Sequence, residues 1–169
     1  MGKTIDFPEI KLLHNGLIKC PLGEVEDWMP EISSIVHECP RSHDDYVVDA
    51  KVHMLMPGQF PCIPNWHGDA IPRDADGQLL MDECNDEHRM FLWLSGPPFT
   101  EFKDGRLVEP QTWIEFGQRD IHRGVVSNDF QWRLFIRMMP TDLVARPRSG
   151  SSCLRRHSQV YLNAGEFTW

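Results

Sequence analysis

Prolines and glycines recur along the whole chain, and they limit the length of every element that it can form. The 169 residues include 13 prolines and 12 glycines, with no long heptad-like apolar pattern between them. Because proline interrupts helices and glycine favours turns, this distribution predicts many short elements joined by turns. It favours β structure in one domain, since a chain of this length suits a single hydrophobic core.

Segments rich in β-branched and aromatic residues indicate about eight strands. We expect them at 46–56, around His67, and at 88–96, 99–102, 106–109, 112–117, 131–139 and 158–163. The clearest helix candidate begins near Pro30 and ends where Pro40 stops it. Short strands without helices between them are typical of an antiparallel sandwich or jelly roll rather than of a parallel sheet.

These expectations divide a single domain, 1–169, into three parts. Residues 1–45 form an N-terminal helical and loop extension, residues 46–140 form the jelly-roll core, and residues 141–169 form a basic segment that returns to the barrel. We therefore place the sheet from Tyr46 onward.

The net charge of the chain argues against some classes of binding partner. Lys and Arg number 17 against 25 Asp and Glu, a net charge of −8, which argues against bulk binding to nucleic acid or to an anionic membrane. Acidic residues concentrate in 74–87, which we interpret as a solvated loop or a lid, and basic residues gather in 146–156.

No apolar run is long enough to span a bilayer, and the first residues lack the apolar stretch of a signal peptide. With five cysteines and no C-x-x-C pair, we expect reduced thiols and a cytoplasmic protein.

Two separated segments carry candidate metal ligands. His67 and Asp69 stand one residue apart in NWHGDAIPR, and an extended strand places residues i and i+2 on the same face. His122, in RDIHRGVV, follows 55 residues later and would join them if a barrel places the two segments side by side. Two histidines and one carboxylate on one face of a metal leave open positions, which suits a ferrous ion that binds a co-substrate and dioxygen.

The segment QWRLFIRMM carries two arginines on a strand that otherwise looks apolar. Alternation places Arg133, Phe135 and Arg137 on one face of this strand. A buried guanidinium is costly unless it meets an anion, and a carboxylate bound by two hydrogen bonds is the natural partner.

The order of these residues resembles the iron(II)/2-oxoglutarate-dependent dioxygenases. H-x-D, a distant histidine and Arg133 eleven residues after it fit the family, and His122, Asn128 and Arg133 are similar in particular to its phytanoyl-CoA-hydroxylase-like branch. The resemblance covers roughly Val47 to Met139. It implies a double-stranded β-helix, the jelly roll of the cupins, in which the triad binds Fe(II) and Arg133 binds the distal carboxylate of 2-oxoglutarate. The family couples oxidative decarboxylation of 2-oxoglutarate to succinate with oxidation, often hydroxylation, of a second molecule.

One position departs from the pattern of the family. Many relatives place a hydroxyl residue two positions after the arginine, where this chain has Phe135. Another group, Tyr46, Thr112 or His53, would then have to bind the carboxylate, or 2-oxoglutarate is not the ligand. Arg137 competes with Arg133 for the role of anchor.

Other neighbours of the ligands are candidates for substrate binding or for orientation of the ligands. Trp66 is expected in the pocket wall, and Asn65 and Asn128 are expected to orient substrate or ligands. His53 is expected at most to support the metal ligands, without binding the metal itself. The expected substrate is a small molecule or a protein side chain, in a pocket completed by the ends of the chain, by the acidic loop or by a second subunit of a homodimer. The alternative is a non-oxidative cupin-like protein, either a metal-dependent isomerase or lyase or a ligand-binding module.

Overall fold

The computed structural model describes residues 10, 13, 16–40, 45–156 and 160–162. Eight strands form two antiparallel sheets, a larger one in the order β5-β3-β7-β2-β1-β8 and a smaller one that pairs β4 with β6. The strands are β1 Gly16–Pro21, β2 Tyr46–Leu55, β3 Met90–Leu94, β4 Thr100–Phe102, β5 Ile114–Phe116, β6 His122–Gly124, β7 Gln131–Pro140 and β8 Leu154–Arg155. In the described part of the chain, α2 spans Val25–Trp28 and α3 spans Ser33–His37. Short 3-10 turns lie at Leu22–Glu24, Pro30–Ile32, Met81–Glu83, Thr141–Leu143 and Gly150–Cys153.

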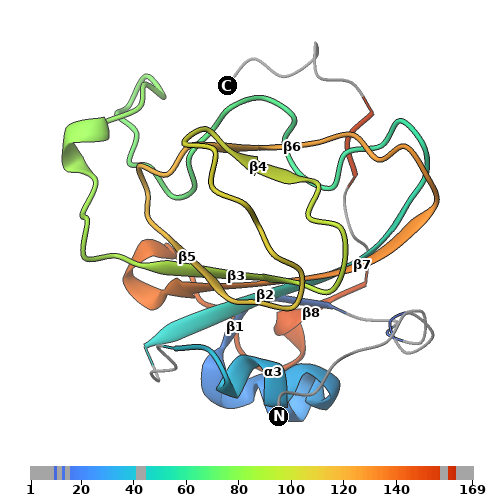
Figure 1. Cartoon of the computed structure of the whole chain (residues 1–169). Helices are drawn as coiled ribbons and strands as arrows, with labels where there is room; N and C mark the ends of the chain where they lie inside the picture. The colour runs from blue at the N-terminus through green and yellow to red at the C-terminus, as the bar shows by residue number, and fades with distance from the viewer. Residues whose placement is uncertain (1–9, 11–12, 14–15, 41–44, 157–159, 163–169) are drawn as a thin grey trace.

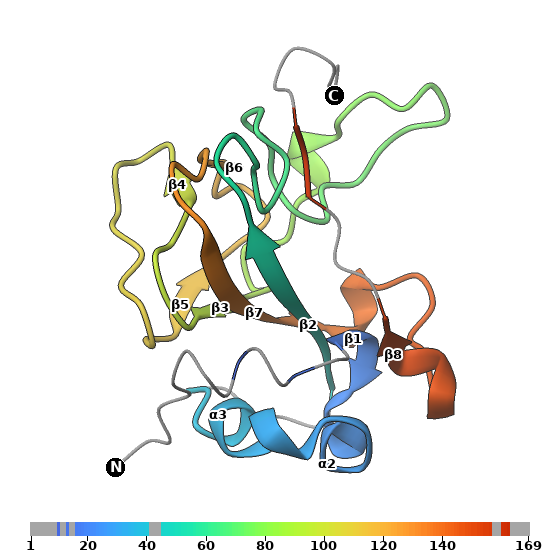
Figure 2. The same cartoon turned by 90° about the vertical axis from the view of Figure 1, so that its right-hand side faces the viewer.

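The molecule is layered, with the larger sheet in the middle. Figures 1 and 2 show the two short helices on one side of this sheet and the smaller sheet with its loops on the other. Among the described residues, none of the helices has both the length and the apolar content that a membrane crossing requires. The expectation of a mainly β, antiparallel protein with a short helical segment near its start is confirmed.

The central pair of strands, β2 and β7, determines which side chains reach the site. The two strands pair over ten residues each, with Asp49 opposite Arg137, Lys51 opposite Phe135 and His53 opposite Arg133. These residues face the smaller sheet, whereas their neighbours Ala50, Leu134 and Ile136 pack in the core under the helices. The predicted alternation of residues 132–137 is therefore confirmed.

The apolar core accordingly has two parts. One lies between the larger sheet and the helices and includes buried residues of β1, α3 and the helix-facing side of β7. The other lies between the two sheets and includes Met90, Leu92, Phe102 and Phe116. Leu92, Phe102 and Phe116 of this second part also line a cavity between the sheets.

Three expectations about strands need correction. The sheet does not begin at Tyr46, because β1 already pairs with β2 and β8 pairs with β1. Residues 106–109 form no strand; the Arg106 side chain instead binds Asp104 and Asp120. The expected strand 158–163 falls partly outside the described residues, and Tyr161 makes a single bridge with Phe60.

Candidate metal centre

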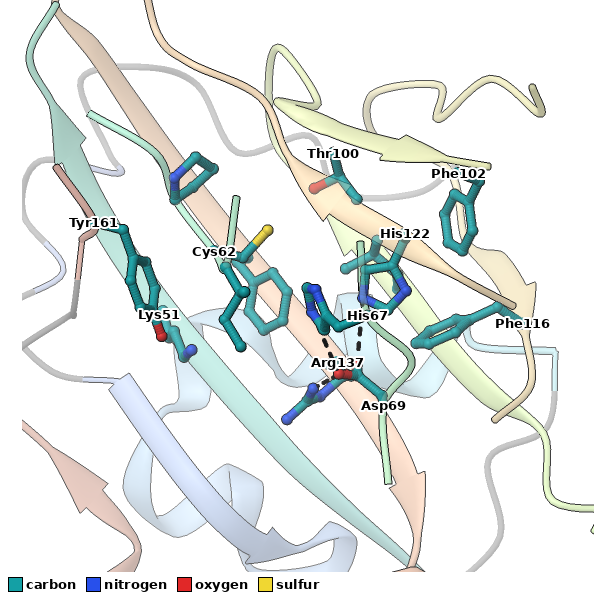
Figure 3. Close-up of a pocket in the computed structure, with 14 residues that line it drawn as sticks. Lys51, Cys62, His67, Asp69, Thr100, Phe102, Phe116, His122, Arg137 and Tyr161 are labelled. Atoms are coloured by element: carbon teal, nitrogen blue, oxygen red, sulfur yellow. Dashed lines mark hydrogen bonds and ion pairs between the residues drawn. The ribbon is translucent and has the colours of Figure 1, made fainter. Parts of the chain in front are cut away.

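The backbones of two distant segments meet at His67 and His122. His67 N–H donates to the His122 carbonyl at 2.9 Å, and His122 N–H donates to the His67 carbonyl at 2.8 Å. Side chains of directly paired residues leave the same face, so the two imidazoles lie together with ring centroids 4.5 Å apart. Asp69, two residues after His67, is carried to the same point (Figure 3).

One ligand atom from each of His67, Asp69 and His122 lies within 4.8 Å of the other two. The Asp69 carboxylate lies 4.0 Å from His67 Nε2 and 3.7 Å from His122 Nε2. Ligands that bind one first-row metal at about 2.1 Å stand about 3 Å apart when they are adjacent. The ligand atoms would have to approach one another by about 1 Å for the two carboxylate–imidazole separations, and by up to about 2 Å for a separation of 4.8 Å, to reach that geometry. The donor set could therefore hold a divalent metal and leave positions for other ligands.

Both imidazoles are oriented by backbone carbonyls. His67 Nδ1 lies 2.8 Å from the Asn65 carbonyl, and His122 Nδ1 lies 3.0 Å from the Asp120 carbonyl. A carbonyl only accepts hydrogen bonds, so each Nδ1 carries the proton and each Nε2 keeps its lone pair for a metal. Burial lowers the pKa of His67, which favours this neutral form.

Gly68, between the two nearby ligands, allows the chain to pack closely at this point. A Cβ there would lie 2.5 Å from the Ile71 side chain and 2.6 Å from the Gln118 carbonyl. On the other side, Phe102 and Phe116 pack against the His122 ring, with centroids 5.3 and 5.7 Å away. These contacts hold the ligand-bearing segments in place.

A chain of charges supports the Asp69 carboxylate. Arg137 donates one hydrogen bond to Asp69 at 2.7 Å and another to Asp49 at 2.7 Å, and the Lys19 backbone N–H donates to Asp49 at 2.9 Å. Burial alone would raise the pKa of Asp69, but the charge and hydrogen bond of Arg137, together with His122 and His67, outweigh it and hold that pKa well below its usual value. Asp69 therefore stays ionised and available to a cation.

A cavity of about 110 Å³ opens beside the triad. Its walls include Lys51, Cys62, Thr100, Phe135, Arg137 and Tyr161 together with the three candidate ligands. Figure 3 shows Lys51 and Tyr161 at one end and Phe102 and Phe116 at the other. An adjoining hollow, lined by Ile71, Arg73 and Leu79, shares His67 and Asp69 as a wall, so the triad can be reached from two sides.

Arg133 is buried behind this cavity rather than in its wall. The side chain is 1% exposed, and its Nη2 donates to the Thr100 hydroxyl at 3.1 Å. Among the described residues, its Nε and Nη1 have no hydrogen-bond partner. Burial lowers the pKa of Arg133 to about 10, which still leaves the guanidinium charged at neutral pH. The guanidinium therefore keeps donors that an anion could use.

The structure places the remaining predicted residues differently. Asn65 contacts the site through its backbone carbonyl, and His53 lies opposite Arg133 in the sheet. Trp66 is not among the lining residues; it is 39% exposed and stacks with Arg123. Asn128 lies exposed in a bend after β6.

Three residues were expected to replace a hydroxyl at Phe135. The Tyr46 hydroxyl donates to the Arg89 carbonyl, Thr112 is exposed, and His53 lies opposite Arg133 in the sheet. The hydroxyl beside Arg133 belongs instead to Thr100, which sequence reasoning missed. No spacing rule links Thr100 to Arg133, because their contact joins two different sheets.

Sequence reasoning also missed Asp49 and Lys51. Alternation along YVVDAKVH places Asp49, Lys51 and His53 on one face of β2, and this signal could have found them. Phe102 and Phe116 were expected only as members of strands.

Comparison of the chain with family models, with curated proteins and with solved structures finds no match. We therefore infer the function from the geometry of the site.

Proposed function

We propose that this protein is an iron(II)- and 2-oxoglutarate-dependent oxygenase whose two sheets correspond to the halves of a double-stranded β-helix. The observation that carries the proposal is the cluster of His67, Asp69 and His122 at the mouth of a cavity between two antiparallel sheets. Two imidazoles and one carboxylate form the facial donor set of non-haem iron oxygenases.

The metal, when bound, supplies the reaction with dioxygen and the oxidising power. The protein supplies three ligands with fixed orientation: the carbonyls of Asn65 and Asp120 hold the imidazoles, and Arg137 holds Asp69 ionised. Three protein ligands leave positions free for a keto acid and for dioxygen.

The arginines of β7 support a dicarboxylate as co-substrate. Arg133 and Arg137 are four residues apart, about 13 Å along a strand, and both guanidinium groups lie near the Phe135 ring, 5.8 and 6.0 Å from its centroid. Arg137 lies beside the candidate metal ligands, and Arg133 lies behind the cavity wall, where it donates to the Thr100 hydroxyl. In this proposal Arg137 would lie near the end of the keto acid that binds the metal, and Thr100 with Arg133 would hold its distal carboxylate.

In this proposal Thr100 supplies the hydroxyl that the family pattern expects at position 135, where this chain has Phe135. Its hydroxyl already accepts a hydrogen bond from Arg133 Nη2, and its side chain lines the cavity. A hydroxyl and a guanidinium together can donate the hydrogen bonds that a carboxylate accepts. In this chain the two groups come from different strands, Thr100 from β4 and Arg133 from β7.

A second candidate function rests on the position of Arg133 outside the cavity wall. If no anion reaches Arg133, the same triad suits a cupin-like metal-dependent isomerase or lyase, or a module that binds a ligand without turnover. The two functions differ in whether 2-oxoglutarate binds.

The test is an anaerobic titration of the Fe(II)-loaded protein with 2-oxoglutarate, followed by absorption spectroscopy. We expect the weak visible charge-transfer band of a keto acid that chelates iron. In Arg133→Met the affinity should fall by about ten-fold or more, because a charge-assisted hydrogen-bond pair is lost. Arg146→Met, at an exposed arginine, is the matched control.

Circular dichroism and thermal unfolding of each variant report whether the fold is retained. Absence of the band in the wild type, without any protection against unfolding by 2-oxoglutarate, would favour the non-oxidative candidate.

A further inference from the structure

Lys51 lies in the cavity wall as a third cation. The roles proposed for the metal ligands and for the two arginines do not involve it. It lies on β2 opposite Phe135, and its ammonium group stands 5.3 Å from the centre of the Phe135 ring. Within the described part of the chain, no carboxylate lies within ion-pair distance of Lys51. Asp49, two residues earlier on the same face, is held by Arg137 and by the Lys19 backbone.

The charges around the cavity do not balance without anions. Arg137 is offset by Asp49 and Asp69, and these three groups together carry one negative charge. A divalent metal, Arg133 and Lys51 add four positive charges, and 2-oxoglutarate removes two. Among these groups one positive charge remains, and Arg155, whose charge acts on Lys51, adds another. Buried charge of one sign is costly until an opposite charge meets it.

The depth of the two cations indicates which ligand each one binds. Arg133 is fully enclosed, whereas Lys51 is partly exposed and shares its end of the cavity with Tyr161 (Figure 3). In the proposed function the co-substrate occupies the side of the cavity nearest Thr100 and Arg133. The side where Lys51 meets solvent is then left for the molecule to be oxidised.

We propose that Lys51 binds the carboxylate of the molecule to be oxidised, so that the substrate is a small monocarboxylic acid. This inference rests on the proposed function, since it assigns Arg133 to the co-substrate. A single ammonium group matches one negative charge, and a cavity of about 110 Å³ suits a small molecule. The ring of Phe135 under the ammonium leaves it oriented toward the cavity rather than toward a protein acid.

The test compares acids with their uncharged amides by calorimetry, on protein that is saturated with Mn(II) and 2-oxoglutarate without oxygen. The probes are propionate, benzoate and phenylacetate, each against propionamide, benzamide or phenylacetamide. At least one acid should bind the wild type about ten-fold more tightly than its amide, the gain expected of a charge-assisted hydrogen bond. Lys51→Met should remove this preference, and Lys51→Arg should keep it.

Lys103→Met is the matched control, because Lys103 is exposed in the turn after β4. It should bind every probe as the wild type does. The proposal is overturned if no acid binds better than its amide, or if Lys51→Met weakens 2-oxoglutarate itself by about ten-fold, which would make Lys51 the co-substrate anchor. Failure of 2-oxoglutarate to bind the wild type would instead refute the proposed function, and the acid–amide comparison on Mn(II) protein would still test Lys51.

Discussion

Asp49 touches none of the candidate ligands, yet the position of Asp69 depends on it. It is 4% exposed, and it binds the same guanidinium that holds Asp69. Burial by itself would raise the pKa of Asp49, but the charge of Arg137 and the Lys19 N–H outweigh it, and the pKa lies below the ordinary 3.8. The ion pair thus stabilises the folded state wherever Asp49 is ionised.

Asp49→Asn should lower the free energy of unfolding of the metal-free protein by about 2 kcal/mol at neutral pH, because Arg137 loses a charged partner. A carboxyl whose pKa is lower in the folded state contributes its full stability above the unfolded value and loses it as pH falls through the folded value. The difference between wild type and variant should therefore shrink below pH 3.8. Urea unfolding at neutral and acid pH measures it, with the exposed Asp27→Asn as the control. A difference that does not change with pH would show that the Asp49 charge is not what matters.

At this scale, the sequence predicted that the three candidate ligands lie together, but it did not predict the residues that support them. His67 and Asp69 are two residues apart, so local geometry alone places them on one face. The contacts of Arg137 with Asp49, and of Arg133 with Thr100, depend on which strands are neighbours and in what register. Spacing within one segment holds no information about that register.

At the scale of elements, β6 is held against the segment that leads to His67. Gly124 N–H donates to the Ile63 carbonyl at 2.7 Å, and a Cβ on Gly124 would lie 2.4 Å from the Cys62 carbonyl oxygen. Because His122 begins the same strand, the separation of these two segments sets the distance between the two candidate histidine ligands.

Gly124→Ala should therefore force β6 away from Cys62. We expect a loss of about 1–3 kcal/mol in the free energy of unfolding, as for other overpacked sites, and weaker binding of Fe(II) or Mn(II). Gly23→Ala is the control, since nothing lies within 4 Å of a Cβ at that position. Chemical unfolding and metal titration report the two effects. Unchanged metal affinity in Gly124→Ala would contradict the view that this contact sets the geometry of the site.

The sequence predicted the long strands β2 and β7 and the shorter β3, β4 and β5, but it did not predict β1, β6 or β8. β2 and β7 have clear alternation and β-branched or aromatic residues over ten positions. β1 escaped prediction because it is short, ends at Pro21 and contains an irregularity in its pairing where Lys19 has a φ of 49°. Residues 106–109 looked like a strand, but Leu107 is 80% exposed and the Arg106 side chain binds acids and a backbone carbonyl.

For the whole molecule, the site joins parts of the chain that are far apart in sequence. His67 and Asp69 come from the long connection between β2 and β3, His122 comes from the smaller sheet, and Arg137 comes from the middle of the larger sheet. Composition predicted one antiparallel β domain, but the arrangement of the two sheets around the cavity follows from tertiary packing. A metal bound here would link both sheets only in the folded state.

Metal binding should therefore stabilise the entire fold. A ligand that binds only the folded state at a concentration 100 times its dissociation constant adds about 2.7 kcal/mol, which for a chain of this size corresponds to a rise in Tm of roughly 5–11 °C. Thermal unfolding with and without Fe(II) or Mn(II) under anaerobic conditions measures the rise, and a chelator should reverse it. His67→Ala and Asp69→Ala should retain the fold but lose the response, whereas His37→Ala, at an exposed histidine of α3, should keep it. Stoichiometric metal in either ligand variant would show that these three side chains are not the ones that bind it.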